Sequence, residues 1–239
     1  MDDSELFAAA QRLPSARRPL LGLTILVIED SRYACEALRL LCLRSGARIR
    51  RADCLKSARR HLQVYRPSVV ITDVGLPDGS GLDLIKEMDA ARPRVRIILA
   101  ISGDENVEEE TLAAGADGFL AKPITSLAAF QNAILSRLPD DRQPSGPRQL
   151  PDETIEPDPI AFLDDMAHAA DVLNDTQEEK SLDYLAQFVG GVARSAGDAP
   201  LAKAAENLAL ARSEGRPVAT DAAVIAGLVQ ERLERKIAI

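Results

Sequence analysis

The chain has 239 residues, enough for one or two domains that each enclose a core. It contains no tryptophan, so its cores must be built mainly from leucine, isoleucine, valine and alanine. No apolar run approaches the roughly 20 residues that cross a bilayer. The N-terminus lacks the basic-then-apolar pattern of a signal peptide. We therefore expect a cytoplasmic protein without a membrane partner.

Alternating strands and helices are expected after an N-terminal extension, residues 1–21, that includes a short helix. Apolar runs and helical spacing place five strands and five helices in alternation. The expected strands are 23–29, 47–52, 67–73, 95–102 and 118–121, and the expected helices are 31–46, 55–65, 81–92, 106–114 and 126–138. Wholly apolar strands are typical of a parallel sheet covered on both faces. Residues 22–138 thus predict an α/β domain with a doubly wound five-stranded sheet.

A second, all-helical domain is expected at residues 158–239. A linker rich in proline and charge, residues 139–157, precedes it. Helices are expected near 159–174, 178–195, 199–214 and 219–236, and their short connections favour an antiparallel four-helix bundle. From Asp152 to the end the chain has 17 acidic and 8 basic residues, a balance that argues against binding nucleic acid.

Polar side chains stand where four of the predicted strands end. Glu29 and Asp30 follow the first strand, Asp73 ends the third, Ser102 ends the fourth and Lys122 follows the fifth. The carboxyl ends of parallel strands meet at one edge, so these groups should converge. Three carboxylates repel one another unless a cation neutralises them, and oxygen ligands suit Mg²⁺. The pattern predicts a Mg²⁺ site and an aspartyl phosphate.

In this hypothesis each group has a separate task. Glu29, Asp30 and Asp73 bind Mg²⁺, and Asp73 attacks the phosphorus in line. Lys122 and the metal hold the phosphoryl oxygens, and Ser102 hydrogen-bonds the product. Taken singly, the same residues have plainer interpretations: an acid at a strand end is usually just solvated, Asp30 could cap a helix, and Lys122 could be a surface charge.

Residues 23 to about 138 resemble the receiver domain of two-component response regulators. The resemblance rests on Glu29-Asp30, on Asp73 within ITDVGLPDGSGLDLI, on Ser102 and on Lys122-Pro123. It implies the strand order 2-1-3-4-5, a cis Lys122-Pro123 bond, and Mg²⁺-dependent phosphorylation of Asp73 by a histidine kinase or a histidine phosphotransfer protein.

Two further positions bear on this resemblance. It makes Phe119 the aromatic switch residue, although simple core packing is the alternative interpretation. Gly75, two residues after Asp73, is small where many receivers carry a side chain. A bare position could admit water easily, so the sequence leaves the lifetime of the phosphoryl group open.

The segment LAQFVGGVARSAG, residues 185–197, resembles the active helix of histidine phosphotransfer domains. Gln187 stands where that family has its histidine, and Gly190 stands where it has a lysine. An amide nitrogen is not nucleophilic, so Gln187 cannot carry a phosphoryl group. The resemblance implies a degenerate domain that keeps its shape and binds a receiver surface or a second copy. The alternative is a plain bundle whose helix breaks or kinks at Gly190-Gly191.

The histidines and cysteines offer few other chemical sites. His168 lies on the first bundle helix and is the one candidate for a phosphoryl-carrying histidine, with a solvated or packing role as the alternative; His61 reads as a surface residue. Cys35, Cys42 and Cys54 lack metal-binding spacing and read as small apolar residues.

The leading interpretation is a response regulator that signals through protein–protein binding of its helical domain or through self-association. It would not be an enzyme with a separate substrate. One alternative is a phosphotransfer protein or phosphate sink that uses His168. The other is a transcription regulator whose DNA-binding output is not recognisable in the sequence.

Overall fold

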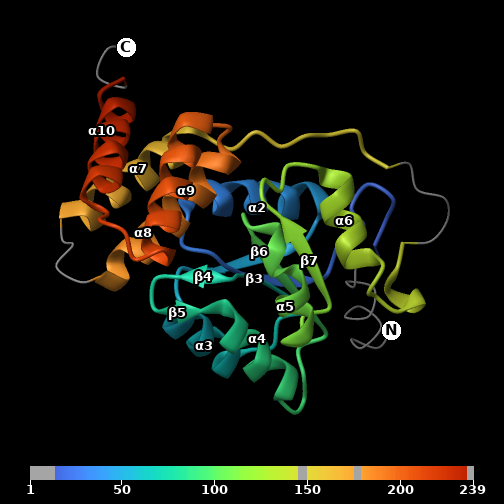
Figure 1. The fold of residues 1–239 in the computed structure, drawn as a ribbon. Helices are drawn as coiled ribbons and strands as arrows, with labels where there is room; N and C mark the ends of the chain where they lie inside the picture. The colour runs from blue at the N-terminus through green and yellow to red at the C-terminus, as the bar shows by residue number, and fades with distance from the viewer. Residues whose placement is uncertain (1–13, 145–149, 175–178, 236–239) are drawn as a thin grey trace, which may run out of the picture.

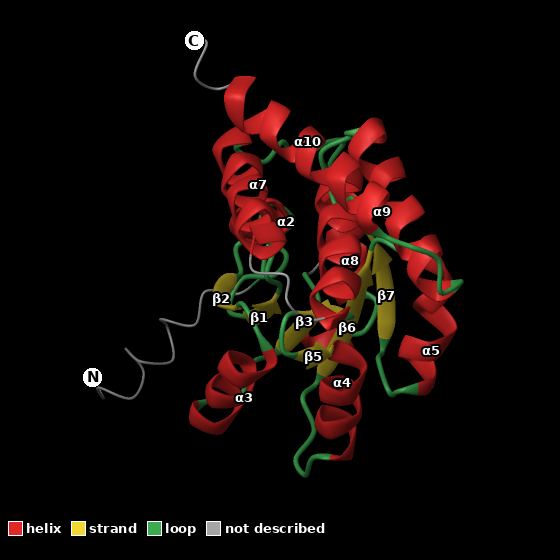
Figure 2. Cartoon of the chain, turned by 60° about the vertical axis from the view of Figure 1, so that its left-hand side comes forward, coloured by secondary structure: helices red, strands yellow, loops and turns green. Residues whose placement is uncertain are grey.

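The computed structural model describes residues 14–144, 150–174 and 179–235. Its main sheet, drawn in Figure 1, has five parallel strands in the order β2-β1-β3-β6-β7, which is the predicted order 2-1-3-4-5; Figure 2 labels all five. The strands are β1 Thr24–Ile28, β2 Arg48–Ala52, β3 Val69–Asp73, β6 Ile97–Ser102 and β7 Gly118–Ala121. The doubly wound α/β fold is therefore confirmed.

Helices cover both faces of this sheet, and each face has its own core. On one face α2 (Arg32–Ser45) and α6 (Leu127–Leu135) pack against the strands through residues such as Leu38 and Phe130. The other face is covered by α3 (Leu55–Val64), α4 (Gly81–Ala90) and α5 (Glu108–Ala113), which a short 3-10 turn, η1 (Glu105–Val107), precedes. Every residue of β3 and β6 is buried, as the apolar runs predicted.

A small antiparallel hairpin follows β3 and was not predicted. Its strands, β4 (Gly75–Leu76) and β5 (Gly79–Ser80), have two residues each, which is too short to show any periodicity. The hairpin projects from the edge where the strand ends gather, and β4 contacts the helical domain (Figure 1). It therefore extends the sheet edge toward the bundle.

The receiver-like unit is longer than residues 22–138 at both ends. Leu20, placed in the N-terminal extension, is fully buried in the α2–α6 core; residues 1–13, with most of the expected helix, lie outside the described residues. Ile155, placed in the linker, is 4% exposed in the same core. Its N–H donates to the carbonyl of Thr125, and Leu127 N–H donates to Glu153. Apolar side chains in charged, proline-containing segments thus anchor both ends.

The C-terminal helices match the predicted positions. They are α7 Pro159–Asn174, α8 Glu179–Ser195, α9 Ala199–Ser213 and α10 Ala219–Arg235, packed as a four-helix bundle around one core. α8 is continuous through Gly190 and Gly191, so the helix does not break there, and the plain-bundle alternative stays open. Gly190 is a point of close approach, where an added Cβ would lie 3.4 Å from Cβ of Ala205 on α9. None of the described helices is long and apolar enough to cross a membrane.

The bundle rests on the carboxyl edge of the sheet. α7 packs along α2, and α8 contacts both α2 and β4. Figure 2 shows α8 standing over the ends of β3 and β6, with α7 beside α2. The helical domain therefore covers the edge at which the acidic residues gather.

Candidate functional site

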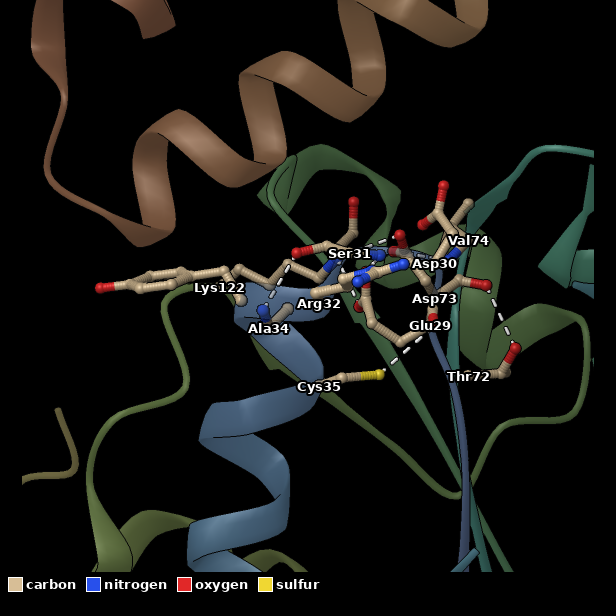
Figure 3. A network of polar contacts seen from close by, with 12 residues as sticks. Glu29, Asp30, Ser31, Arg32, Ala34, Cys35, Thr72, Asp73, Val74 and Lys122 are labelled. Atoms are coloured by element: carbon tan, nitrogen blue, oxygen red, sulfur yellow. Dashed lines mark hydrogen bonds and ion pairs between the residues drawn. The ribbon is translucent and has the colours of Figure 1, made fainter. Parts of the chain in front are cut away.

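The three predicted carboxylates and the predicted lysine converge at the carboxyl edge of the sheet (Figure 3). One carboxylate oxygen from each of Glu29, Asp30 and Asp73 lies within 4.8 Å of the others. Glu29 and Asp73 are buried, and Asp30 is partly buried. The cause is topological, because β1 and β3 are adjacent parallel strands that end at the same level.

Lys122 joins two of these carboxylates. Its Nζ lies 2.7 Å from Oε2 of Glu29 and 3.0 Å from Oδ2 of Asp73, and its side chain is 6% exposed. It follows β7, two strands away from Asp73, and the Lys122–Pro123 bond is cis. The other oxygen of Asp73, Oδ1, accepts the N–H of Val74 at 2.9 Å. Asp73 is thus held in place from two sides.

Burial and mutual repulsion shape the charge state of the cluster. Burial raises the pKa of Glu29 well above its usual range, and the charges of Asp73 and Asp30 add to the rise, although Lys122 opposes it. Burial also raises the pKa of Asp30 to about 6. The pKa of Lys122 is raised as well: burial opposes this, but the charges of Asp73 and Glu29 outweigh it. Ionising all three carboxylates beside a single lysine is therefore costly at this buried edge.

These residues fit a divalent cation. Three carboxylates supply oxygen ligands, the donor type that Mg²⁺ prefers, and a cation would relieve the cost of burying their negative charges close together. Glu29, Asp30 and Asp73 would hold the ion. When bound, it would neutralise charge on phosphoryl oxygens during transfer.

The hydroxyl and the aromatic residue occupy different positions. Ser102 ends β6 beside Asp73, is 4% exposed, and accepts the N–H of Asp104 at 3.1 Å. Phe119 lies on β7 and is partly buried against the α3–α4–α5 core. Phe119 therefore packs against the core in this structure, and its role as an aromatic switch stays a prediction.

A tyrosine of the helical domain reaches the acidic cluster. The hydroxyl of Tyr184 on α8 donates to Oδ2 of Asp30 at 2.7 Å, a bond that spans 154 residues of sequence. Burial and the charge of Asp30 raise the pKa of Tyr184, so the phenol keeps its proton. Nε2 of His168 lies 3.1 Å from the same hydroxyl. Because the single Tyr184 proton goes to Asp30, Nε2 must be the donor to Tyr184.

His168 is therefore linked to the cluster through Tyr184. Its ring also packs edge-on against Phe188, with centroids 5.1 Å apart. The packing role given as its plainer interpretation thus has direct support.

Of the other residues set aside, Cys35 and Cys42 are buried free thiols whose pKa burial raises to about 12. The interpretation of these two cysteines as small apolar residues is confirmed.

Asp165 of α7 caps the first receiver helix from outside. Its carboxylate accepts three hydrogen bonds at the N-terminus of α2: from Ser31 Oγ at 2.7 Å, from Arg32 N–H at 2.7 Å and from Tyr33 N–H at 3.0 Å. The first N–H groups of a helix have no partner within the helix and favour negative charge. The buried carboxylate of Asp165, 1% exposed, supplies both the hydrogen-bond acceptors and the negative charge.

A cavity of about 750 Å³ lies between α8 and α9 and the carboxyl edge of the sheet. The receiver side of its wall includes Asp73, Ser102 and Lys122, and the bundle side includes Gln187 and Arg194. Gln187 lies against Gly75 so closely that a side chain at Gly75 would overlap it. The side chain of Gln187 therefore occupies the space beside this bare position, and the access of water to it stays a prediction.

Sequence reasoning missed Tyr184, Asp165 and Arg194 as parts of this site. All three lie on bundle helices, where polar positions read as solvent-facing. Asp165 carried one signal, since it is an acid on the buried side of an amphipathic helix and such acids need a partner.

A family model of the response regulator receiver domain matches residues 25–134. This segment is a receiver domain. Over 162 residues the chain is 28% identical to the KDP operon transcriptional regulatory protein KdpE of Escherichia coli K12, covering 66% of each. Over 120 residues it is 32% identical to the transcriptional regulatory protein PhoP of the same strain, covering 47% of this chain and 52% of PhoP.

Solved receiver domains resemble the same part of the chain. The receiver domain of sensor histidine kinase PA1611 from Pseudomonas aeruginosa PAO1, solved with a magnesium ion, is 26% identical and has a TM-score of 0.42. That match covers 46% of this chain and 93% of the solved receiver domain. The chain spans about half the length of PhoP and about two thirds of KdpE.

Proposed function

We propose that this protein is a two-component response regulator whose Asp73 accepts a phosphoryl group from a histidine protein in the presence of Mg²⁺. The observation that carries the proposal is the position of Asp73, held between Lys122 and the backbone of Val74 and within metal-binding reach of Glu29 and Asp30. The family match, which names a receiver domain, supports it.

The chain's own residues account for the proposed transfer. Oδ of Asp73 forms a bond to phosphorus while the bond from phosphorus to the donor's imidazole nitrogen breaks, and the donor keeps that electron pair. The Lys122 ammonium binds a phosphoryl oxygen, and the Ser102 hydroxyl donates to another. No separate substrate is converted, so the protein acts as a phosphoprotein and not as an enzyme for an external substrate.

We further propose that the helical domain is the output and signals by binding a protein partner or a second copy. Its position supports this role, because Tyr184 and Asp165 attach the bundle to the acidic cluster and to α2. A new charge on Asp73 would therefore act at the contact between the domains. The degenerate phosphotransfer origin of the bundle also belongs to the proposal, and the place of Gln187 beside Gly75 supports it.

Intact-mass spectrometry after incubation with acetyl phosphate and Mg²⁺ tests the proposal. The native chain should gain one base-labile phosphoryl group, and Asp73→Ala should gain none. Asp104→Ala is a matched control, because Asp104 lines the same cavity but lies outside the carboxylate cluster. A native chain that gains no group would refute the assignment. An acid-labile group lost with His168→Ala would favour the phosphate-sink alternative.

DNA binding is a second candidate, because KdpE and PhoP are named transcriptional regulatory proteins. The charge balance of residues 152–239, 17 acidic against 8 basic, weighs against it. Retention of the phosphorylated chain on duplex DNA that falls steeply with salt would establish this candidate.

A further inference from the structure

One cation of the helical domain reaches the receiver's phosphorylation edge. Arg194 lies in the last turn of α8 and lines the same cavity as Asp73, Ser102 and Lys122. A Cβ added to Gly103, which directly follows Ser102, would lie 2.7 Å from Nη2 and 2.9 Å from Nε of Arg194. The guanidinium therefore lies against the backbone of Gly103.

Two glycines make room for this guanidinium. Besides Gly103 on the receiver side, Gly190 lies one turn back on α8, where an added Cβ would be 3.3 Å from Nη1 of Arg194. Glycine inside a helix costs up to about 1 kcal/mol relative to alanine. The place of Arg194 over Gly190 gives this position a steric reason.

Arg194 has a side-chain N–H donor without a partner among the described residues, whereas the neighbouring cations are bound to carboxylates. In the cavity wall, Lys122 is bound to Glu29 and Asp73, and Arg212 is bound to Asp183 at 2.8 Å. By contrast, Nε of Arg194 is buried and has no hydrogen-bond partner among the described residues. A buried donor without a partner is costly, so its presence at a reactive edge indicates a ligand.

We propose that Arg194 is a phosphoryl-binding residue that the helical domain supplies to the receiver's site. Phosphorylation of Asp73 adds a charge of about −1.5 to −2 and three strong acceptor oxygens. A planar guanidinium with five donors suits a phosphate group, and a charge-assisted bond is stronger than a neutral one. The phosphoryl group is thus held by Lys122 from the receiver and by Arg194 from the bundle.

The direction of the signal follows from this arrangement. A ligand shifts a two-state equilibrium toward the state that binds it better. Because Arg194 reaches the phosphoryl group only while α8 rests on the receiver (Figure 2), phosphorylation strengthens the docked arrangement. The signal is therefore a tighter union of the two domains. This inference rests on the proposed function, since it requires a phosphoryl group on Asp73.

Binding of beryllofluoride, a stable mimic of the phosphoryl group, tests the inference in the full chain with Mg²⁺. Calorimetry should show affinity about tenfold weaker for Arg194→Ala, as expected for one charge-assisted hydrogen bond. Arg194→Lys keeps the positive charge, so its affinity for beryllofluoride should lie between those of the native chain and Arg194→Ala. Arg212→Ala is the matched control: it lines the same cavity but is already bound to Asp183, so its affinity should stay near native.

Hydrogen exchange supplies a second measurement that a merely structural role would not change. Beryllofluoride should slow amide exchange in α8 of the native chain and not in Arg194→Ala, while both bind Mg²⁺ alone equally well. Equal beryllofluoride affinity in the native chain and Arg194→Ala would overturn the inference, as would equal weakening in Arg212→Ala. If the native chain neither binds beryllofluoride nor gains mass from acetyl phosphate, the proposed function itself fails.

Discussion

The phenol of Tyr184 in the helical domain donates a 2.7 Å hydrogen bond to Asp30 of the receiver's acidic cluster. One oxygen of a proposed metal ligand is thereby bound to the output domain. Asp30 therefore belongs both to the proposed metal site and to the contact between the domains. A change in metal binding should alter the docking of the bundle, and a change in docking should alter metal binding.

Removing this hydroxyl should weaken docking. Tyr184→Phe leaves the partly buried Asp30 carboxylate with one bond fewer, and a hydrogen bond to a charged group is worth about 1.5–3 kcal/mol. Amide exchange in α8 should accelerate by roughly tenfold or more. Tyr65→Phe is the control, since the Tyr65 hydroxyl is buried without a partner in the described chain and should cost little. Equal exchange in both variants would contradict the role of Tyr184.

Asp165 should matter more than its neighbour of the same charge. Asp165→Ala removes three hydrogen bonds from the N-terminus of α2, so we expect docking to weaken by about 2–3 kcal/mol. Asp164→Ala removes only an exposed ion pair with Arg32, worth about 0–1 kcal/mol. Limited proteolysis of residues 150–158, between the domains, should report the difference. A similar cleavage rate for both variants would refute this ranking.

Mg²⁺ should stabilise the chain through the carboxylate cluster. At neutral pH the ion relieves repulsion among Glu29, Asp30 and Asp73, so its addition should raise the melting temperature and a chelator should reverse the change. In Asp30→Asn the rise should be largely lost. Asp53→Asn, which alters an exposed acid outside the cluster, should respond like the native chain. An undiminished rise in Asp30→Asn would exclude Asp30 as a ligand.

The bundle should lose stability in acid because of Asp198. Its carboxylate caps α9 by accepting the N–H of Leu201 and binds Arg232, whose guanidinium holds the pKa of Asp198 below its usual range. A lowered pKa in the folded state means that the stabilisation is complete above the unfolded value near 4 and is lost as pH falls below it. Denaturant unfolding at pH 7 should show Asp198→Ala to be about 1–2 kcal/mol less stable.

The same comparison at low pH tests the expected direction of the pH dependence of stability. The deficit of Asp198→Ala should shrink progressively as pH falls below about 4 and through the lower pKa of the folded state, where the native carboxylate takes up a proton. Asp171→Ala, an exposed acid on α7, should show no such trend. A deficit that stays constant with pH would mean that packing, and not the charge of Asp198, stabilises this end of α9.

Gln187→His tests the proposed origin of the bundle. The side chain at 187 lies against Gly75 and lines the cavity that contains Asp73. A histidine there should accept a phosphoryl group from Asp73, giving an acid-labile product that disappears when Asp73→Ala is added. Adding Gly190→Lys should not help, because Arg194 occupies the space next to Gly190. Failure of the single variant to gain an acid-labile group would count against the phosphotransfer ancestry.

The receiver fold and its reactive edge were predictable because their causes are local. Buried parallel strands appear as short apolar runs, and Glu29, Asp73 and Ser102 occur where those runs end. The helices of the bundle followed in the same way from spacing and from breaks at glycine and proline. The β4–β5 hairpin escaped because two-residue strands carry no period.

The two anchors outside the predicted domain escaped for a different reason. Leu20 and Ile155 lie in charged, proline-containing segments, where one or two apolar residues form no periodic pattern. Their burial in the α2–α6 core depends on where the chain passes after the sheet has formed.

The linear order of residues is sufficient to place the receiver, the carboxylate cluster and the four helices, since strand ends and helix faces are set by neighbours along the chain. It does not reveal that Tyr184 binds Asp30, that Asp165 caps α2, or that Arg194 lies against Gly103. These contacts join positions more than 90 residues apart, and they exist because two independently patterned surfaces have matching shape and charge. The contact between the two domains therefore belongs to the tertiary structure alone.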